Sequence, residues 1–156
     1  IGYTFQITSI FFNLTVYENV ALAIKKDSTN REENSVSEVL NKVGLLDRIE
    51  QRSGDLSYGH QRLLELAMGM AQKPKLLILD EPTQGLSDSE IENFKKLIKD
   101  ISSSTTILLI EHNMDVVMSI ADNISVLHFG EIIADGDKET IKNDPIVQKA
   151  YLGDWC

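Results

Sequence analysis

Residues 75–82, KLLILDEP, decide the fold, because an uninterrupted apolar run leads into two adjacent carboxylates and then a proline. Apolar runs without alternation are typical of strands covered on both faces, as in a parallel sheet with helices on either side. Open α/β sheets bind their ligands at the carboxyl ends of such strands. There Asp80 can hold Mg²⁺ and Glu81 can polarise an attacking water. The alternative is a buried strand that ends in a solvated turn.

A second apolar strand is predicted at residues 105–110, just before His112. Between the two strands, residues 87–90, SDSE, predict a capped start for an amphipathic helix. A strand–helix–strand unit places both strand ends on one edge of the sheet. We therefore expect His112 to lie near Asp80 and Glu81, where it can contact a phosphate or a positioned water. A histidine after a strand is otherwise an ordinary capping or core residue.

Residues 56–61, LSYGHQ, lead into residues 62–71, whose apolar residues recur at the spacing of one helix face and predict a helix. Ser57 is a typical N-cap, and Gly59 lets the backbone come close to whatever lies in front of it. A helix start with free N–H groups, a hydroxyl and a glycine is suited to bind an anion. From this segment alone, a serine-capped core helix with nothing bound is the favoured alternative.

The N-terminal third predicts further helices. A short strand into Phe5, a loop at Gln6 and a helix at about residues 16–24 are expected first. Residues 25–34 are polar and predict an exposed loop. Residues 35–38, SVSE, match a capping box for a short helix that Gly44 ends.

The C-terminal part predicts a helix, a hairpin and a helical tail. The helix is expected at residues 114–121, and two strands around a tight turn at residues 124–134. The tail at about residues 138–152 is helical with a break at Asp144–Pro145, and Gly153 suits a stop.

The composition limits the possible functions. At 156 residues the chain is long enough for one domain with a hydrophobic core. The net charge is −9 and Lys and Arg are not clustered, which argues against nucleic-acid binding. The single cysteine, Cys156, excludes an internal disulfide framework and suits a reducing compartment. No run approaches the roughly 18 apolar residues of a membrane span.

In this order, the motifs resemble those of the ATP-binding subunit of ABC transporters, over essentially the whole chain. The matching segments are Gln6 for the Q-loop, 56–61 for the signature, 76–82 for Walker B with its catalytic glutamate, 84–87 for the D-loop and His112 for the switch histidine. The ending, residues 130–153, is similar to the subfamily of branched-chain amino acid and urea-type importers.

Three departures from the family pattern stand out. His60 replaces the usual glutamine of the signature, and Ser87 stands where a D-loop commonly carries aspartate. The third is that no Gly-x-x-x-x-Gly-Lys-Ser/Thr occurs in these residues. In the family this P-loop lies upstream of the Q-loop, so we expect Ile1 to begin after it.

The resemblance implies an α/β fold of the P-loop NTPase type, a parallel sheet flanked by helices, without the Walker A strand, loop and helix. Residues 1–156 would then form a partial nucleotide-binding domain. Its parts are expected to be a helical signature subdomain at about 7–72, a core sheet at about 73–136 and a C-terminal helical tail at 137–156.

The resemblance also implies ATP and Mg²⁺ as ligands, with Asp80 and Gln6 on the metal. Glu81 would be the general base and His112 would contact the γ-phosphate, while Gln6 would also link the site to the membrane partner. ATP held by a second subunit would meet the signature and D-loop residues Ser57, Tyr58, Gly59, His60, Gln61, Gly85 and Ser87.

The function implied is an ATP-hydrolysing subunit of an ABC importer for a small polar solute such as branched-chain amino acids or urea. Its partners would be permease subunits, a second ABC subunit and, indirectly, a solute-binding protein, at the cytoplasmic face of the plasma membrane. Because the P-loop makes most of the contacts that bind the phosphates, we expect the 156 residues alone to bind ATP poorly and to be inactive.

Two alternatives remain open. The chain can be a non-catalytic module or remnant that docks a permease through Phe11, Phe12 and Tyr17 without hydrolysing ATP. It can also be a non-transport ABC protein, such as a repair or translation ATPase. The absence of a basic cluster and the importer-like tail argue against the latter.

Overall fold

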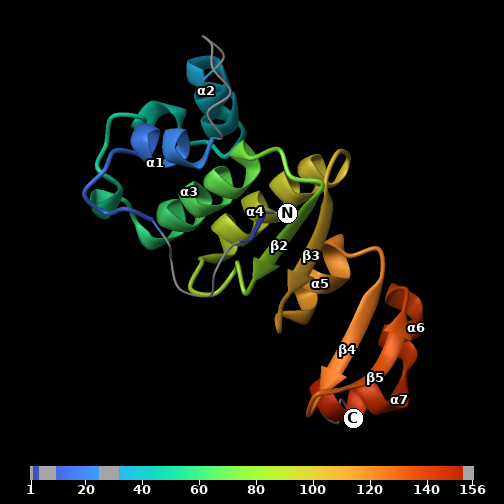
Figure 1. Ribbon diagram of the computed structural model, residues 1–156. Helices are drawn as coiled ribbons and strands as arrows, with labels where there is room; N and C mark the ends of the chain where they lie inside the picture. The colour runs from blue at the N-terminus through green and yellow to red at the C-terminus, as the bar shows by residue number, and fades with distance from the viewer. Residues whose placement is uncertain (1, 4–9, 25–31, 153–156) are drawn as a thin grey trace. The chain divides into compact units, whose positions relative to one another are not determined.

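A computed structural model describes residues 2–3, 10–24 and 32–152 (Figure 1). The chain divides into two units, residues 1–112 and 113–156. The first unit contains β1 (Gly2–Tyr3), α1 (Val16–Ala23), α2 (Glu32–Lys42), the 3-10 turns η1 (Leu46–Arg48) and η2 (Ser53–Asp55), α3 (Tyr58–Ala71), β2 (Leu76–Asp80), α4 (Asp88–Ser102) and β3 (Thr106–Ile110). The second contains α5 (Met114–Ile120), β4 (Ile124–His128), β5 (Glu131–Gly136), α6 (Lys138–Asn143), α7 (Pro145–Val147) and the π-helical turn η3 (Gln148–Leu152). The predictions for Phe5, Gln6 and Gly153 lie outside the described residues.

The sheet of the first unit has the order β1-β2-β3, and both pairings are parallel. Asp80 at the end of β2 is in register with Ile110 at the end of β3. Figure 1 shows the two strands side by side with α4 as the connection between them. This confirms the predicted strand–helix–strand unit with both carboxyl ends on one edge.

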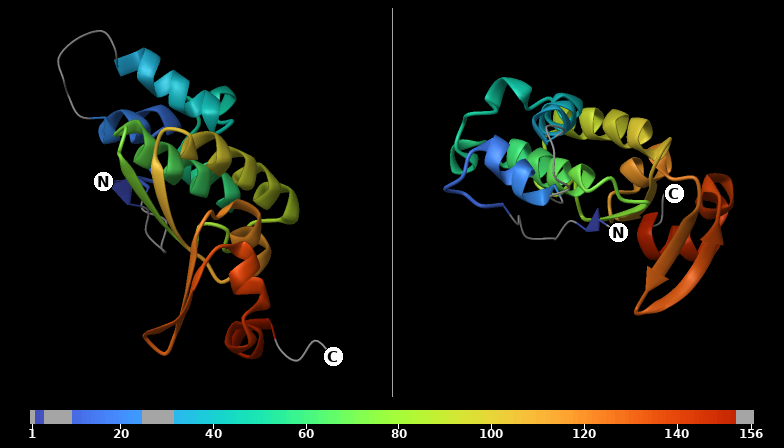
Figure 2. Two further views of the ribbon diagram at one scale, coloured as in Figure 1. Left: turned by 90° about the vertical axis from the view of Figure 1, so that its right-hand side faces the viewer. Right: turned by 45° about the horizontal axis from the view of Figure 1, so that its top comes forward.

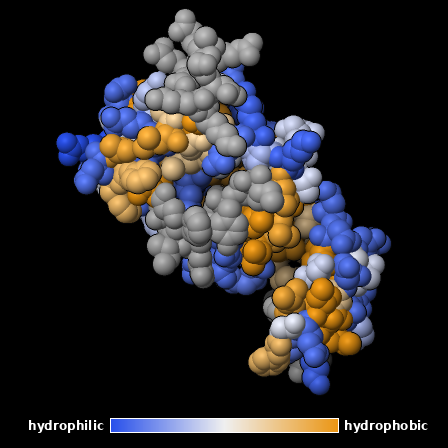
Figure 3. All heavy atoms as spheres, in the orientation of Figure 1, coloured by the Kyte–Doolittle hydropathy of each residue, from blue (hydrophilic) through white to orange (hydrophobic). Residues whose placement is uncertain are grey.

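Helices α3 and α4 cover one face of this sheet. Leu79 of β2, Leu66 of α3 and Phe94 of α4 line one small cavity, and all three side chains are buried. On the other face Leu108 and Ile110 of β3 are about half exposed, and apolar side chains gather there in Figure 3. Within the part of the chain that the structure describes, this face of β3 is therefore only partly covered.

The helices α1, α2 and α3 pack against one another (Figure 2). Helix α1 begins after Thr15, whose hydroxyl accepts a hydrogen bond from the N–H of Glu18 while the Glu18 carboxylate accepts one from the N–H of Thr15. Helix α2 already runs from Glu32, so the capping box predicted at residues 35–38 is wrong. Residues 35–38 therefore lie inside the helix and not at its start. Its end is as predicted, since Gly44 has a φ of 73°.

The second unit is built on the β4–β5 hairpin, which is antiparallel. The predicted tight turn is present, and Phe129 and Gly130 within it both have positive φ. The core of this unit consists of Ile124, Val126, Ile141 and Val147. Asp144 caps α7 by accepting from the N–H groups of Ile146 and Val147, and Pro145 occupies the first turn, which confirms the predicted break.

None of the helices within the described ranges has both the length and the apolar character that crossing a membrane requires.

Candidate functional site

The chain turns sharply where β2 ends. Glu81 has a φ of 46°, in the left-handed region that residues other than glycine rarely adopt. Two backbone hydrogen bonds hold it there: its N–H donates to the Ile110 carbonyl at 2.9 Å, and its carbonyl accepts from the N–H of Gln84 at 3.2 Å. The constrained backbone fixes the direction in which the Glu81 side chain leaves the sheet edge. Such strained positions often lie at functional sites.

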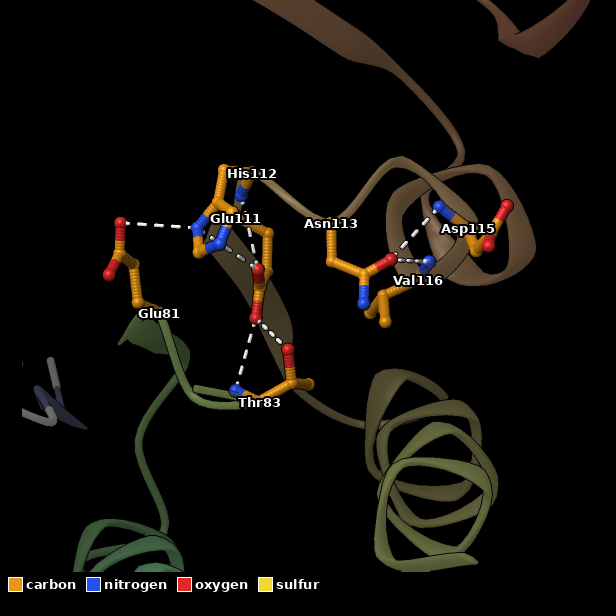
Figure 4. Close-up of polar contacts among 7 residues, drawn as sticks. All are labelled: Glu81, Thr83, Glu111, His112, Asn113, Asp115 and Val116. Carbon is orange, nitrogen blue, oxygen red and sulfur yellow. Dashed lines mark hydrogen bonds and ion pairs between the residues drawn. The ribbon is translucent and has the colours of Figure 1, made fainter. Parts of the chain in front are cut away.

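The side chains of Glu81 and His112 meet at this edge (Figure 4). Glu81 Oε1 lies 3.3 Å from His112 Nδ1, with the histidine side chain 67% exposed and the glutamate side chain 26% exposed. The predicted proximity of His112 to the acids after β2 is thereby confirmed for Glu81. Both groups are accessible to a ligand that approaches from solvent.

A third acid lies beneath this pair and was missed from the sequence. The Glu111 side chain is fully buried, and its Oε1 accepts hydrogen bonds from the N–H of Thr83 at 3.0 Å and from the Thr83 hydroxyl. Its other oxygen accepts from the N–H of His112 at 3.1 Å. The signal available in the sequence was an acid directly before the histidine at the carboxyl end of a strand.

The start of α3 presents the second group of predicted site residues. Ser57 is the N-cap, as predicted, and its Oγ accepts from the N–H of His60 at 3.3 Å and lies 2.9 Å from His60 Nδ1. The Gln61 side chain turns back instead, and donates to the carbonyls of Ser53 and Leu56 at 3.3 Å. Gln61 therefore holds the preceding loop, whereas Ser57 and His60 lie at the exposed helix start.

The loop between β2 and α4 packs against this helix start. A Cβ atom on Gly85 would lie 2.9 Å from Cε1 of Tyr58, and a Cβ atom on Gly59 would overlap Oε1 of Glu90. The hydroxyl and the N–H of Ser87 both donate to Glu90, at 2.7 Å and 2.8 Å. These bonds hold the pKa of the Glu90 carboxyl below its ordinary value of 4.5, against a small opposing effect of desolvation and with a minor contribution from His60.

Oxygen donors for a cation are present at the sheet edge. Asp80 is the last residue of β2 and is half-buried. The described residues contain no group of three or more His, Cys, Asp and Glu side chains placed to enclose a metal. Magnesium at nucleotide sites uses one or two protein carboxylates and takes its other ligands from phosphates and water. Asp80 fits that requirement, and Gln6 lies outside the described residues.

Comparison with known proteins decides the family. The family profile described as "ABC transporter" matches residues 1–84, more than half of the chain. The chain belongs to the ABC transporter family. The high-affinity branched-chain amino acid transport ATP-binding protein LivG of Escherichia coli (strain K12) is 37% identical to this ABC chain, over 97% of the chain and 67% of LivG. The high-affinity branched-chain amino acid transport ATP-binding protein BraF of Pseudomonas aeruginosa is 38% identical, over 97% of this chain and 67% of BraF.

A solved ATP-binding cassette of an ABC transporter, in its ADP conformation, superimposes with a TM-score of 0.83 at 26% identity, over 98% of this chain and 68% of that structure. The α/β fold of the P-loop NTPase type is thus confirmed, and so is the resemblance to the ATP-binding subunits of branched-chain amino acid transporters. This ABC chain spans about two thirds of the length of the relatives it matches.

Proposed function

We propose that these residues belong to the ATP-hydrolysing subunit of an ABC importer for branched-chain amino acids or a related small polar solute such as urea. The observation that carries the proposal is the Glu81–His112 pair, 3.3 Å apart at the carboxyl edge of a parallel sheet. The similarity to LivG and BraF supports the class of solute.

In this proposal Glu81 accepts the proton of the attacking water, and His112 donates a hydrogen bond to the γ-phosphate. Phosphoryl transfer needs mainly positioning and charge neutralisation. The constrained backbone of Glu81 supplies the positioning, and its partial burial leaves the carboxylate within reach of a water. Asp80, together with Gln6, would hold Mg²⁺, which neutralises charge on the phosphates when bound.

The start of α3 would bind the γ-phosphate of ATP held by a second subunit. Ser57 and His60 offer a hydroxyl and an imidazole at a helix N-terminus, whereas the α-carbon of Gly59 is in contact with the Glu90 carboxylate. Tyr58 packs on Gly85, which ties this start to the loop that carries Ser87. A subunit of this kind would work at the cytoplasmic face of the plasma membrane with permease subunits and a partner ATPase.

A second candidate function rests on the surface near α1. Phe11 and Phe12 are 56% and 51% exposed, which is unusual for large apolar side chains. A module that docks a permease through them without hydrolysing ATP would use this surface alone. Co-purification with a permease in the absence of ATP turnover would favour it.

The test uses the complete gene product that contains these residues. We expect Glu81→Gln to lower ATP turnover by about a hundredfold or more, because general-base catalysis contributes factors of that order. Glu50→Gln, a change at an exposed acid, is the matched control and should leave turnover unchanged. Equal turnover by the Glu81→Gln variant and the unaltered protein would refute the assignment.

The 156 residues alone provide a separate test. Because they contain no Gly-x-x-x-x-Gly-Lys-Ser/Thr, we expect weak ATP binding and negligible hydrolysis. Isothermal titration calorimetry with ATP measures this directly, and tight binding would contradict it.

A further inference from the structure

Glu111 joins two segments that are distant in sequence. One carboxylate oxygen accepts from Thr83, in the loop after β2, and the other accepts from the N–H of His112, directly after β3 (Figure 4). The Glu111 side chain is fully buried, so water does not replace these donors. Figure 4 shows the Glu111 carboxylate between the Thr83 backbone and the His112 ring.

A buried carboxylate is stable only when its oxygens accept hydrogen bonds. Loss of any one donor leaves a charged group partly unsatisfied, which is far more unfavourable than loss of a bond at the surface. The two segments are therefore held at a fixed separation by one rigid group. Hydrogen bonds to an ionised acceptor are also shorter and stronger than bonds between neutral groups.

The two segments carry the two predicted catalytic side chains. Thr83 lies two residues after Glu81, and Glu111 directly precedes His112. The N–H of Glu81 also donates to Ile110, so both sides of the connection meet at the end of β3. We propose that Glu111 is a positioning residue that sets the separation of Glu81 and His112. This inference rests on the proposed function for its catalytic meaning, but its geometric content can be tested without ATP.

The first experiment uses the 156-residue chain and nuclear magnetic resonance. Ring protons of His112 should show a nuclear Overhauser contact with the Glu81 side chain, and His60 and His128 supply reference signals. Glu111→Gln keeps the shape of the side chain, but one carboxylate oxygen is replaced by an NH₂ group. This group cannot accept a hydrogen bond, so it faces the donors of either Thr83 or His112 without bonding to them. We expect the His112–Glu81 contact to be lost in this variant.

The control is Ile98→Val, a mild truncation in the buried face of α4 that lowers stability without touching these polar groups. It should retain the contact. A folded Glu111→Gln variant that also retains the contact would overturn the proposal. Should Glu111→Gln not fold, Thr83→Val removes only the hydroxyl donor and should still weaken the contact. An unchanged contact in Thr83→Val would likewise overturn it.

The second experiment measures ATP turnover in the complete gene product. Glu111→Gln should lower kcat about tenfold or more, since small misplacements of reacting groups have effects of that size, and should leave KM for ATP unchanged. In a His112→Ala background the same change should have little further effect. An equal loss in both backgrounds would show a general structural role and refute the proposal. Absence of turnover in the unaltered protein would instead refute the proposed function, and the magnetic resonance result would still decide the role of Glu111.

Discussion

The carboxylate of Glu90 lies directly against the α-carbon of Gly59, in the space that any larger side chain would need. Glu90 also accepts two hydrogen bonds from Ser87, and so caps α4 while it lies beside the second residue of α3. The negative charge is favourable near both helix N-termini. One acid thus connects the starts of two helices.

Gly59→Ala should displace Glu90 and weaken the cap of α4. Alanine is otherwise the better helix residue, by up to about 1 kcal/mol. We therefore expect Gly59→Ala to be neutral or destabilising in the normal background and stabilising in a Glu90→Ala background. Urea unfolding of the four proteins measures the difference, and strictly additive changes would contradict this relationship.

The cap should also make stability depend on pH. Because Ser87 lowers the pKa of folded Glu90 below 4.5, the ionised form favours the folded state. This stabilisation is fully present above the pKa that Glu90 has in the unfolded chain. It is lost as the pH falls through the lower pKa that Glu90 has in the folded chain. We expect the stability difference between the unaltered chain and Glu90→Gln to shrink below about pH 4.5. Urea unfolding over a pH series checks this; a pH-independent difference would argue that the charge has no role.

Asn19 should be among the most sensitive polar positions in the first unit. It is fully buried, and its amide accepts from the N–H of Phe11 and donates to the Phe11 and Thr15 carbonyls and to Ser53. Asn19→Ala leaves several of these groups unsatisfied and should lower the free energy of unfolding by about 2–4 kcal/mol. Asn93→Ala, at an exposed position of α4, should change it by about 0.5 kcal/mol or less. Chemical denaturation measures the free energy of unfolding of both variants. Equal losses would rule out a special contribution of the Asn19 hydrogen bonds to stability.

The buried pair of Arg62 and Glu65 should show strong coupling. Their charged atoms are 2.9 Å apart, and Arg62 also donates to the hydroxyl of Tyr58 at 3.2 Å. Replacing either residue with methionine removes the ion-pair partner of a buried charge and should lower stability by about 3–5 kcal/mol. The double variant should lose much less than the sum of the single changes. A double-mutant cycle in urea tests this, and additivity would exclude coupling.

The sheet edge that carries Glu81 and His112 was predictable from sequence because it depends on a local pattern. The apolar run before Asp80 and the one before His112 lead to parallel strands, and their ends must then meet. The position of Glu111 directly before His112 is visible in the sequence, but its hydrogen-bond partner is not. Its importance comes from Thr83, which is close only in the folded chain, and a pattern in sequence does not show such a pairing.

The errors in predicting the capping boxes also have a physical reason. The SVSE sequence at residues 35–38 satisfies a capping pattern, but α2 already includes Glu32, so this sequence lies inside the helix. Conversely, Thr15 and Glu18 form a capping box that the sequence contains, although the prediction did not use it. Capping patterns are short, so they recur inside helices as well as at their starts.

The register of the first unit's sheet has a consequence for how the chain is made. Gly2 pairs with Leu77, whereas β2 and β3 are joined by a single helix. Among the three strands of this sheet, β1 comes first in sequence, so its pairing with β2 must wait until β2 has been synthesised. Closing that long loop is also entropically less favourable than closing the one around α4. We therefore expect pairing of β2 with β3 to precede the addition of β1, so that the earliest of these three strands in sequence is the last of them to be fixed.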